Sequence, residues 1–327
     1  MLDNLSHNIQ GVYFLLFPKR NLEKKISFLL DKYDSQLDYV SKRVNYYCSF
    51  DPNSSFSSKQ QTKYEILNNG SRYCYDFYEY MRFFNPNLLF HLESGDVNYE
   101  VKTPSFCKSR PIAKNPTSNN ILLKLDKKRH FNFLTQELRE SIPYSQKFNQ
   151  VFFRGGCYQK NRQDFMHKFF NHPLVNAGHT GSLRNEEFRT WNKGRASIKE
   201  HLKYKFIMSL EGNDTATNLK WIMSSNSLVL MPKPKFETWF MEGMLIENHH
   251  YLEIRDDFSD LEERVDFILK NPSLAQEIIY QANQYIKQFL KKDLEDLISF
   301  LVMRKFFYLT NQIEVSKKEE EIFNSSS

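Results

Sequence analysis

The sequence is poor in several features that would assign it to a familiar class. It has only 10 glycines in 327 residues and contains neither a complete GxGxxG pattern nor a Walker pattern, so no nucleotide-binding signature is present in full. No internal repeat is visible. The four cysteines are far apart in the chain and form no CxxC pair, namely Cys48, Cys74, Cys107 and Cys157. We interpret them as reduced thiols that mostly serve packing, as expected in a cytosolic protein.

No stretch has the composition of a targeting or membrane-spanning segment. The first ten residues, MLDNLSHNIQ, include an acid and no apolar core, which predicts no signal peptide. No uncharged run approaches the roughly 18 residues of a membrane span. We therefore expect a cytoplasmic protein, with peripheral contact to the inner membrane left open through the apolar segment 294–307. The alternative is that this segment packs against the N-terminal domain, because a helix with one apolar stripe usually faces a core.

The charge balance argues against a nucleic-acid partner. The chain has 45 basic and 39 acidic residues, a net charge of +6, which is compatible with an anionic nucleotide sugar or membrane surface but is far from a nucleic-acid signature. A basic cluster at Lys124, Lys127, Lys128 and Arg129 is interleaved with acids. It indicates a solvated face or a phosphate-lined cleft rather than an RNA site.

The segment 203–254 is the most informative part of the sequence. Residues 204–210 form an apolar run that predicts a strand, and residues 227–231 predict a second. Between them lie a polar turn with Gly212 and a helical pattern with Leu219, Ile222 and Met223 on one face. Strand, turn, helix and strand make a βαβ unit, which places a helix start beside the carboxyl end of a strand.

That helix start could bind phosphate, since backbone N–H groups and a positive dipole end favour an anion there. Lys220 adds a cation, and hydrogen-bonding side chains crowd the turn at Asn213, Asp214, Thr215, Thr217 and Asn218. The alternative is a solvated, well-capped helix start in an ordinary α/β domain.

Further strands and helices alternate along the chain. We expect strands at 88–92, 121–125 and 151–153, and helices at 75–84, 162–170, 259–269 (opened by a Ser259–Glu262 capping box), from Pro272, and at 294–307. Alternation implies parallel sheets. We therefore predict an α/β protein with two Rossmann-like domains facing a cleft. Residues 1–145 would form the first domain, with a helical N-terminal extension, and residues 146–327 the second, with terminal helices.

Many short motifs, in order, resemble glycosyltransferase family 90, which holds fungal capsule-associated proteins, animal protein O-glucosyltransferases and bacterial lipopolysaccharide glycosyltransferases. The bacterial branch is most similar. The motifs are Gly95-Asp96-Val97, Lys108-Ser109-Arg110-Pro111-Ile112, Leu123-Lys124-Leu125-Asp126-Lys127, Arg129-His130-Phe131, Phe153-Arg154-Gly155, Glu211-Gly212-Asn213-Asp214, Ala216-Thr217-Asn218-Leu219-Lys220-Trp221, Met231-Pro232-Lys233-Pro234, Glu237-Thr238-Trp239-Phe240-Met241-Glu242-Gly243 and His250-Tyr251.

The resemblance implies a GT-B architecture and an inverting transfer from a UDP-sugar to a cell-surface glycan or glycolipid acceptor, such as the lipopolysaccharide core. No cofactor is implied beyond the UDP-sugar itself. Eukaryotic relatives are typically secretory-pathway proteins, and this chain departs from them in its N-terminus. It also has Asn218 where animal members carry an arginine in the phosphate loop, which favours Lys220 as the cation from this helix.

The predicted donor site combines this turn with a strand end. Arg154 follows the apolar strand 151–153 and precedes Gly155, so its guanidinium could pair with two phosphate oxygens at a crevice. An arginine paired with a carboxylate at a strand end is the alternative. Glu237 or Glu242 could accept hydrogen bonds from ribose hydroxyls, while Trp239 between them is interpreted as a core residue.

Two aspartates are candidates for the general base. Asp96 lies at a predicted strand end after Gly95 and near the base of the protein O-glucosyltransferases that the chain resembles, although a plain turn aspartate fits equally. Asp126 is the second candidate, because it also ends a strand within a dense motif. Acceptor contacts are predicted for Arg110, Lys127, Arg129 and His130.

No metal site is predicted. The chain has no DxD motif at a convincing strand end, and the neighbours His249 and His250 would point to opposite faces of a strand. No Cys/His or Ser/His pair suggests a covalent nucleophile. A different class of function stays open, namely a non-catalytic nucleotide-sugar-binding or scaffold protein of the same fold.

Overall fold

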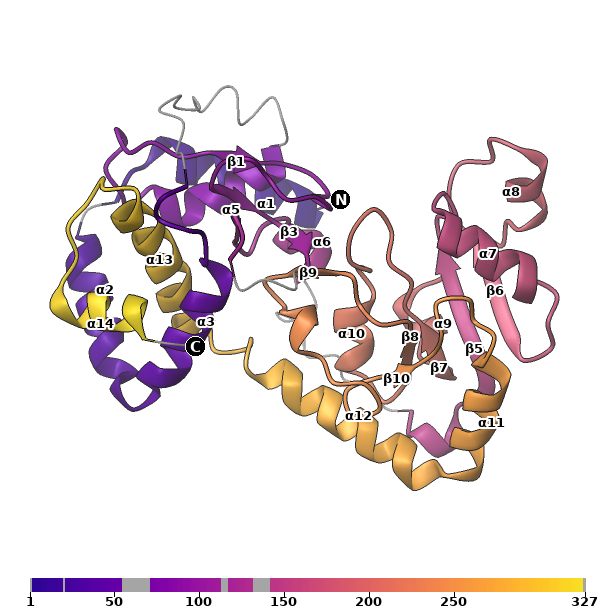
Figure 1. Ribbon diagram of the computed structural model, residues 1–327. Coiled ribbons are helices and arrows are strands. Elements are labelled where there is room, and N and C mark those ends of the chain that lie inside the picture. Colours follow the sequence, from indigo (N-terminus) through magenta and orange to yellow (C-terminus); the bar gives the residue numbers. More distant parts are fainter. Residues whose placement is uncertain (1, 20, 55–70, 113–116, 132–141, 326–327) are drawn as a thin grey trace. The chain divides into compact units, whose positions relative to one another are not determined.

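The computed structural model describes residues 2–19, 21–54, 71–112, 117–131 and 142–325 (Figure 1). The chain forms two compact units that interleave along the sequence. The first comprises Met1–Lys128, Phe236–Trp239 and Lys291–Ser327, and the second comprises Arg129–Lys235 and Phe240–Leu290. The predicted domains 1–145 and 146–327 are each continuous in sequence. The observed first unit also takes in Phe236–Trp239 and Lys291–Ser327 from the C-terminal half of the chain. The C-terminal helices belong to the first unit because their apolar side chains are buried there.

The first unit has a small parallel sheet and a helical core. Its three strands, β1 (Leu92–Glu93), β2 (Ser105–Cys107) and β4 (Asn120–Leu122), lie in the order β1-β2-β4. A separate antiparallel pair joins β3 (Ser109–Pro111) to β9 (Phe236–Thr238). The strands predicted at 88–92 and 121–125 are therefore present, but they are shorter and displaced.

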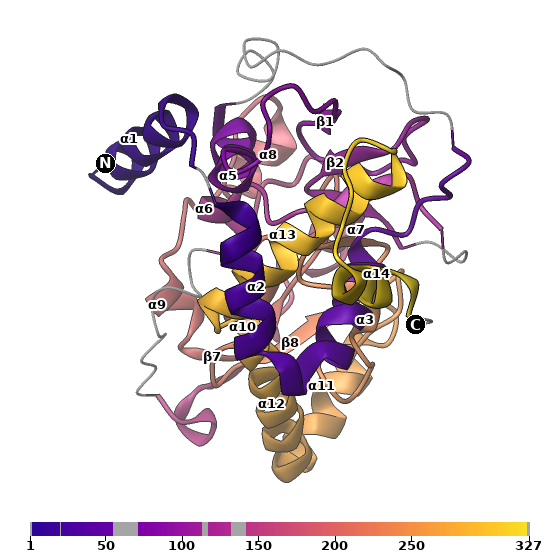
Figure 2. The same ribbon diagram turned by 90° about the vertical axis from the view of Figure 1, so that its left-hand side faces the viewer.

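The structure describes seven helices that belong to the first unit wholly or, for the helix at 127–130, in part. They are α1 (Leu2–Leu16), α2 (Leu22–Lys32), α3 (Leu37–Tyr47), α5 (Ser71–Met81), α6 (Lys127–His130), α13 (Lys292–Leu309) and α14 (Lys317–Asn324). Figure 2 shows α13 between the other helices, and it packs against α2 and α3. Phe306 of α13 lies 4.6 Å, ring to ring, from Phe106 of β2. The terminal apolar helix is thus a core helix, which confirms the packing interpretation and leaves no apolar face of α13 for a membrane.

A buried polar network attaches β9 to the first unit. Arg43 of α3 pairs with Glu295 of α13, and both side chains are 3% exposed. The indole N–H of Trp239 donates to Glu295 at 2.6 Å, and its ring stacks on Tyr47 at 4.0 Å. Trp239 is fully buried, which confirms its interpretation as a core residue.

The second unit is built on a five-stranded parallel sheet. The strands β5 (Phe148–Gly155), β6 (Val175–His179), β7 (Tyr204–Met208), β8 (Leu228–Met231) and β10 (Leu252–Glu253) lie in the order β10-β8-β7-β5-β6. Counted by position in the chain this order is 2-1-3-4-5 from the β6 edge, one of the two common doubly wound orders. From β5 the chain continues to β6 on one side, whereas the later strands β7, β8 and β10 lie on the other side of β5. The topological switch point is therefore between β5 and β7.

Successive side chains of each strand point to opposite faces of the sheet, and different helices pack on the two faces. Phe153, Phe206 and Leu230 belong to one core cluster with residues of α7 (Lys160–Phe169), α11 (Leu261–Lys270) and α12 (Pro272–Lys287). Phe152 points to the other face, where its ring contacts His201 of α9 (Ile198–His201) at 4.7 Å. His201 in turn contacts Trp221 of α10 (Leu219–Met223) at 5.2 Å. Helices thus cover both faces, which confirms the α/β class.

Two local predictions were wrong or incomplete. The helix after Ser259 begins at Leu261 with Asp260 as its N-cap and without a side-chain cap, because Asp260 instead accepts a hydrogen bond from the Arg255 amide at 2.9 Å. A complete capping box occurs at Ser316 and Glu319, opening the unpredicted helix α14.

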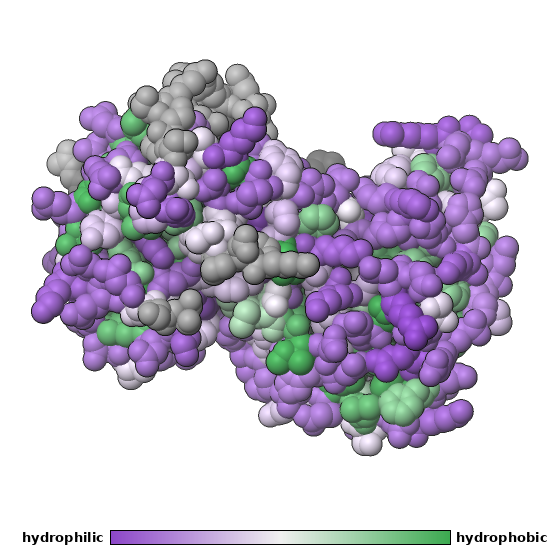
Figure 3. Space-filling view, in the orientation of Figure 1, coloured by the Kyte–Doolittle hydropathy of each residue, from purple (hydrophilic) through white to green (hydrophobic). Residues whose placement is uncertain are grey.

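All four cysteines are buried and free, which confirms their interpretation as reduced packing residues. Hydrophilic side chains predominate on the face shown in Figure 3, with apolar ones in smaller groups. Among the residues of the ranges given above, no helix is both long and apolar enough to cross a membrane.

Candidate active site

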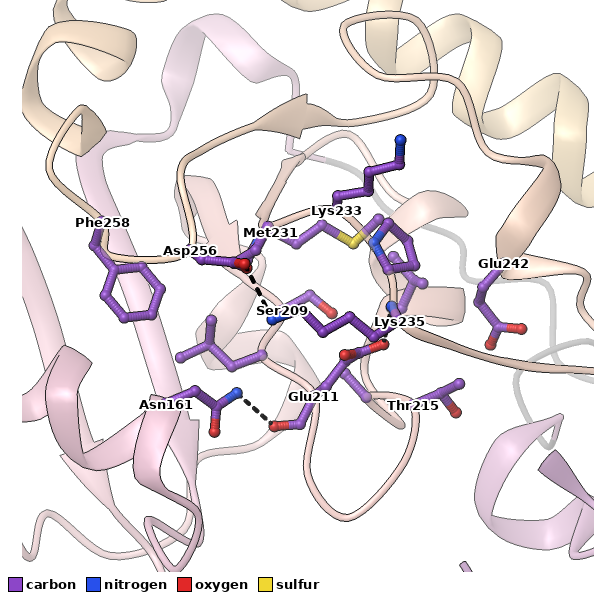
Figure 4. Close-up of a pocket in the computed structure, with 15 residues that line it drawn as sticks. Asn161, Ser209, Glu211, Thr215, Met231, Lys233, Lys235, Glu242, Asp256 and Phe258 are labelled. Carbon is purple, nitrogen blue, oxygen red and sulfur yellow. Dashed lines mark hydrogen bonds and ion pairs between the residues drawn. The ribbon is translucent and has the colours of Figure 1, made fainter. Parts of the chain in front are cut away.

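A pocket of mixed polar and apolar lining lies at the carboxyl ends of β7, β8 and β10, the edge at which open parallel sheets bind ligands (Figure 4). Its space is about 60 Å³, so a nucleotide sugar would extend out of it. Every lining residue belongs to the second unit: Asn161, Ser209, Leu210, Glu211, Thr215, Ala216, Leu219, Met231, Pro232, Lys233, Pro234, Lys235, Glu242, Asp256 and Phe258. Of the predicted donor-binding residues, Thr215 and Glu242 line it.

The lining of this pocket carries charged side chains of both signs, with two lysines and three acids. Lys235 bonds through its ammonium to Asp256 at 3.1 Å and through its amide to Glu211 at 3.0 Å. The Asn161 side chain donates to the Glu211 carbonyl at 3.1 Å. Lys233, on the same loop, is exposed. The pocket therefore offers both cations and hydrogen-bonding groups to a polar, anionic ligand.

Arg162 of α7 spans the topological switch point and was not among the predicted site residues. Its guanidinium donates to the Gly156 carbonyl beyond β5 at 3.0 Å, and to the carbonyls of Leu210 and Glu211 beyond β7 at 2.7 and 3.1 Å. Burial lowers the pKa of Arg162. A Cβ at Gly212 would come within 3.3 Å of Nη2, so the glycine allows the turn to lie against this side chain. Arg162 holds the two strand ends together and contributes positive charge at the crevice.

The turn 211–218 is ordered by its own side chains. Asn218 donates to the Met208 carbonyl at 3.0 Å and accepts from the Ser209 hydroxyl at 3.1 Å, so it fastens the turn to β7 rather than capping α10. Asn213 accepts from Gln159 at 2.9 Å. Thr217 is half-buried and Asp214 is 3% exposed.

Thr215 is the member of this turn that is best prepared for a ligand. Its side chain is 4% exposed, it lines the pocket, and its hydroxyl has no hydrogen-bond partner in the part of the chain that the structure describes. A buried hydroxyl that lacks a hydrogen-bond partner costs free energy. Its position at a pocket wall therefore favours a ligand atom or a water molecule that accepts its hydrogen bond.

Lys220 occupies a different environment from the one predicted. Its ammonium is completely buried and lies 2.7 Å from the equally buried Glu242 carboxylate. The rings of Phe131 and Phe240 lie 5.6 and 5.2 Å from it. The structure thus brings two predicted donor residues together as an ion pair under the pocket, where each neutralises the other.

Arg154 and Gly155 lie at the end of β5, as predicted. The Arg154 guanidinium, however, folds back along the strand, donates to Asn176 of β6 at 2.8 and 2.9 Å, and covers the Phe152 ring at 4.4 Å. It pairs with an amide and a carbonyl rather than with a carboxylate. Its role toward phosphate stays a prediction and would require a different rotamer.

Glu237 and Arg110 form a buried pair across the β3–β9 ladder of the first unit. Arg110 Nε donates to Glu237 at 2.7 Å, and the Tyr46 hydroxyl donates to the same carboxylate. Arg110 also donates to the carbonyls of Tyr46 and Asn120 at 2.9 and 3.3 Å. The predicted ribose ligand and the predicted acceptor ligand are therefore joined to each other.

Asp96 lies in the loop after β1 and is the more accessible base candidate. Its side chain is 23% exposed and accepts a hydrogen bond from Lys108, which is 1% exposed, at 2.5 Å. The preceding Gly95 has φ 101°, a conformation that glycine adopts without strain. The buried Lys108 ammonium therefore holds the Asp96 carboxylate in place while one side of it stays accessible.

Asp126 is more deeply buried, 1% exposed, and has φ 50°, an unusual conformation for a non-glycine residue that occurs at functional sites. Arg72 approaches it to 3.7 Å. The residues that follow form α6, where the Lys127 ammonium pairs with Glu79. Arg129 is exposed, whereas His130 is 1% exposed, so His130 would need a local opening to touch an acceptor.

The paired histidines lie in a turn before β10 rather than on a strand, so the expectation that they point to opposite faces was wrong. Their rings are 4.6 Å apart, and His250 accepts from the Ile246 amide at 2.9 Å. Within the ranges that the structure covers, no group of three or more His, Cys, Asp or Glu is arranged to hold a metal ion.

Comparison with known proteins identifies the family. Residues 126–326 match the family described as Glycosyl transferase family 90. The chain is 44% identical over 241 residues to the O-glucosyltransferase LpsA of Dichelobacter nodosus, an alignment that covers 73% of each protein. It is 26% identical over 159 residues to Protein O-glucosyltransferase 1 of Rattus norvegicus, which covers 46% of this chain and 40% of the relative. It is also 29% identical over 166 residues to the O-glucosyltransferase rumi of Drosophila pseudoobscura pseudoobscura, covering 47% and 40%. The chain therefore belongs to glycosyl transferase family 90 and is a glycosyltransferase.

Proposed function

We propose that this protein transfers one sugar, with glucose as the first candidate, from a UDP-sugar to a hydroxyl of a cell-surface glycan, the lipopolysaccharide core. We further propose that the transfer inverts the anomeric centre, needs no metal ion, and occurs in the cytoplasm. The observation that carries the proposal is the pocket beside the topological switch point of the second unit, lined by lysines and by a hydroxyl without a partner among the described residues, in a chain 44% identical to an O-glucosyltransferase.

The donor is assigned to the second unit. Its diphosphate would lie at the turn 211–218, where the Thr215 hydroxyl has no partner among the described residues and where Lys233 and Lys235 supply cations at the pocket. Arg162 adds a buried positive charge behind the turn. Together these groups would stabilise the negative charge that develops on UDP as it leaves.

The acceptor is assigned to Asp96 and to the predicted acceptor residues, of which Arg110 and Lys127 belong to the first unit and Arg129 and His130 to the second. The two units would be the Rossmann-like halves of a GT-B enzyme. The acceptor hydroxyl oxygen forms a bond to C1 of the sugar, the bond from C1 to the UDP oxygen breaks, and UDP leaves with the bonding electrons. Asp96 accepts the hydroxyl proton in the same step. One displacement of this kind inverts the anomeric carbon, and it uses one base and no covalent nucleophile.

Asp126 is the second candidate for that base. Its burial requires the acceptor to enter deeply, whereas the half-exposed Asp96 carboxylate meets solvent already. A general base must first reach the proton that it removes. We therefore assign the proton to Asp96, and we assign Asp126 to positioning α6, with Arg110, Lys127, Arg129 and His130 as the predicted acceptor-side residues.

The direct test incubates the purified protein with individual UDP-sugars and measures released UDP, with and without truncated lipopolysaccharide acceptors. We expect UDP release that depends on one sugar and on the acceptor, and that excess chelator leaves unchanged. Binding of UDP without release for any donor and acceptor would favour the non-catalytic alternative. Release that chelator abolishes and manganese restores would contradict the metal-independent mechanism.

A further inference from the structure

The N-terminal helix α1 carries an apolar stripe that faces solvent. Ile9, Val12, Tyr13, Leu16 and the following Phe17 are 62%, 43%, 47%, 66% and 54% exposed. Their spacing of three, four, seven and eight residues from Ile9 places them on one face of the helix. Single exposed apolar residues are common on proteins, but a continuous stripe of five marks an interaction surface.

This stripe is not the face by which α1 attaches to the fold. Phe14 is 9% exposed, and His7 bonds to Asp76 of α5 at 3.2 Å. A Cβ at Gly11 would lie 2.1 Å from the Tyr75 ring, so this glycine permits a close approach of α1 to α5. Figure 2 shows α1 at the edge of the first unit, next to α5. The packing face and the exposed stripe are therefore separate surfaces of one helix.

Cations follow the stripe in the chain, and one lies against it. Lys19 and Lys24 are exposed just beyond Phe17, and the Arg82 guanidinium lies 5.6 Å from the Tyr13 ring and 4.1 Å from the Phe14 ring. The nearby acid Glu23 lies 3.5 Å from Arg304, which offsets its charge. Apolar side chains bordered by lysine and arginine are the composition of helices that lie in the plane of an anionic membrane surface.

We propose that the stripe of α1 binds an anionic lipid bilayer surface, with Ile9, Leu16 and Phe17 inserted among the acyl chains and Lys19 and Lys24 at the headgroups. A second copy of the chain is a poorer occupant, since a stable protein interface takes roughly 20–30 residues a side and this stripe has five. The inference concerns a different surface from the donor pocket and does not depend on which sugar is transferred.

The test is co-sedimentation of the full chain with vesicles of phosphatidylglycerol and phosphatidylcholine, compared with vesicles of phosphatidylcholine alone. Each large apolar side chain that enters the membrane strengthens partitioning by about tenfold. The double variant Leu16→Ser/Phe17→Ser should therefore lose about tenfold to a hundredfold in binding. Phe28→Ser is the matched control, because Phe28 of α2 is 64% exposed in the same unit but lies outside the stripe.

The charge component is tested separately. Lys19→Gln and Lys24→Gln should each reduce binding to the anionic vesicles by about fivefold, and raising the salt concentration should weaken wild-type binding. All these positions are exposed, so thermal unfolding should be unchanged and loss of binding would not reflect unfolding.

Three outcomes would overturn the proposal. The first is equal binding of wild type and Leu16→Ser/Phe17→Ser, and the second is equal binding to anionic and neutral vesicles. The third is a wild-type dimer in light scattering that the double variant dissociates, without vesicle binding, which would make the stripe a protein interface.

Discussion

The buried Lys220–Glu242 pair gives a prediction that separates a structural from a donor-binding role. Both side chains are 0% exposed and their charged atoms are 2.7 Å apart. Lys220→Met keeps the length of the side chain but removes its charge, which leaves the Glu242 carboxylate buried without its cation. Breaking a buried pair in this way costs about 3–5 kcal/mol of unfolding free energy. For a unit of 150–250 residues that corresponds to a decrease in Tm of about 6–20 °C.

The assay is urea and thermal unfolding of wild type and variants, with UDP binding measured by calorimetry on the folded proteins. Glu242→Gln should be destabilised similarly, and the double variant Lys220→Met/Glu242→Leu should recover much of the loss, since well-packed apolar pairs often replace buried ion pairs at little cost. Lys199→Met is the control at an exposed lysine and should be neutral.

A Lys220→Met protein with wild-type stability would refute the structural role of the pair. If that protein also lost UDP affinity by about 1.5–3 kcal/mol, the worth of a charged hydrogen bond, then Lys220 would contact phosphate directly, as the sequence alone predicted.

The remaining predictions concern a hydroxyl, an imidazole and the thiols. Thr215→Val should weaken UDP binding by about 0.5–1.5 kcal/mol in calorimetry without loss of stability, and unchanged affinity would remove Thr215 from the donor site. Burial lowers the pKa of His250 to about 4, so the unfolded chain binds a proton that the folded chain does not, and wild-type stability should fall as pH decreases from about 6.5 to 4. His250→Asn should reduce that dependence in unfolding curves, and an identical pH profile would contradict it. The buried thiols, with the pKa of Cys48 and Cys157 raised to about 11, should react with a thiol reagent only after unfolding, and fast labelling of native protein would refute their burial.

Local patterns predicted the strands β5, β7 and β8 and the helices α7, α10, α11 and α12 of the second unit, but not β6, β10 or α9. The apolar runs that became β5, β7 and β8 are bounded by polar turns, and their residues need no distant partner to be recognised as strands. The helix from Pro272 was found from its N-terminal proline for the same reason. The capping box predicted at Ser259 does not form. The Asp260 carboxylate instead accepts a hydrogen bond from the Arg255 amide, which precedes the helix.

The polar residues of the site were harder to predict because their partners are distant in the sequence. Glu237 pairs with Arg110 across 127 residues, and Glu242 pairs with Lys220 across 22. Arg162 acts on carbonyls 48 and 49 residues away, and nothing in its own helix marks it. Its conspicuous neighbour Arg154, before two glycines, attracted the phosphate assignment instead.

Helix α1 shows a similar limit. The sequence predicts a helical N-terminal extension, but apolar residues lie on more than one face of this helix, and the sequence cannot say which face meets α5. The contact of Gly11 with Tyr75 decides this and leaves the stripe from Ile9 to Phe17 exposed.

The most direct test of the account is transfer of labelled sugar from UDP-glucose to truncated lipopolysaccharide by wild type, Asp96→Asn and Asp126→Asn, expressed per mole of folded protein. Asp96→Asn keeps a hydrogen-bond acceptor for Lys108 but removes the base, so we expect UDP affinity to survive and turnover to fall by about 10²- to 10⁴-fold. Asp126→Asn should lose less turnover than Asp96→Asn, or its effect should appear as a raised KM. Abolished turnover in Asp126→Asn with near-normal Asp96→Asn would exchange the two roles, and no transfer by wild type from any UDP-sugar would contradict the proposed function.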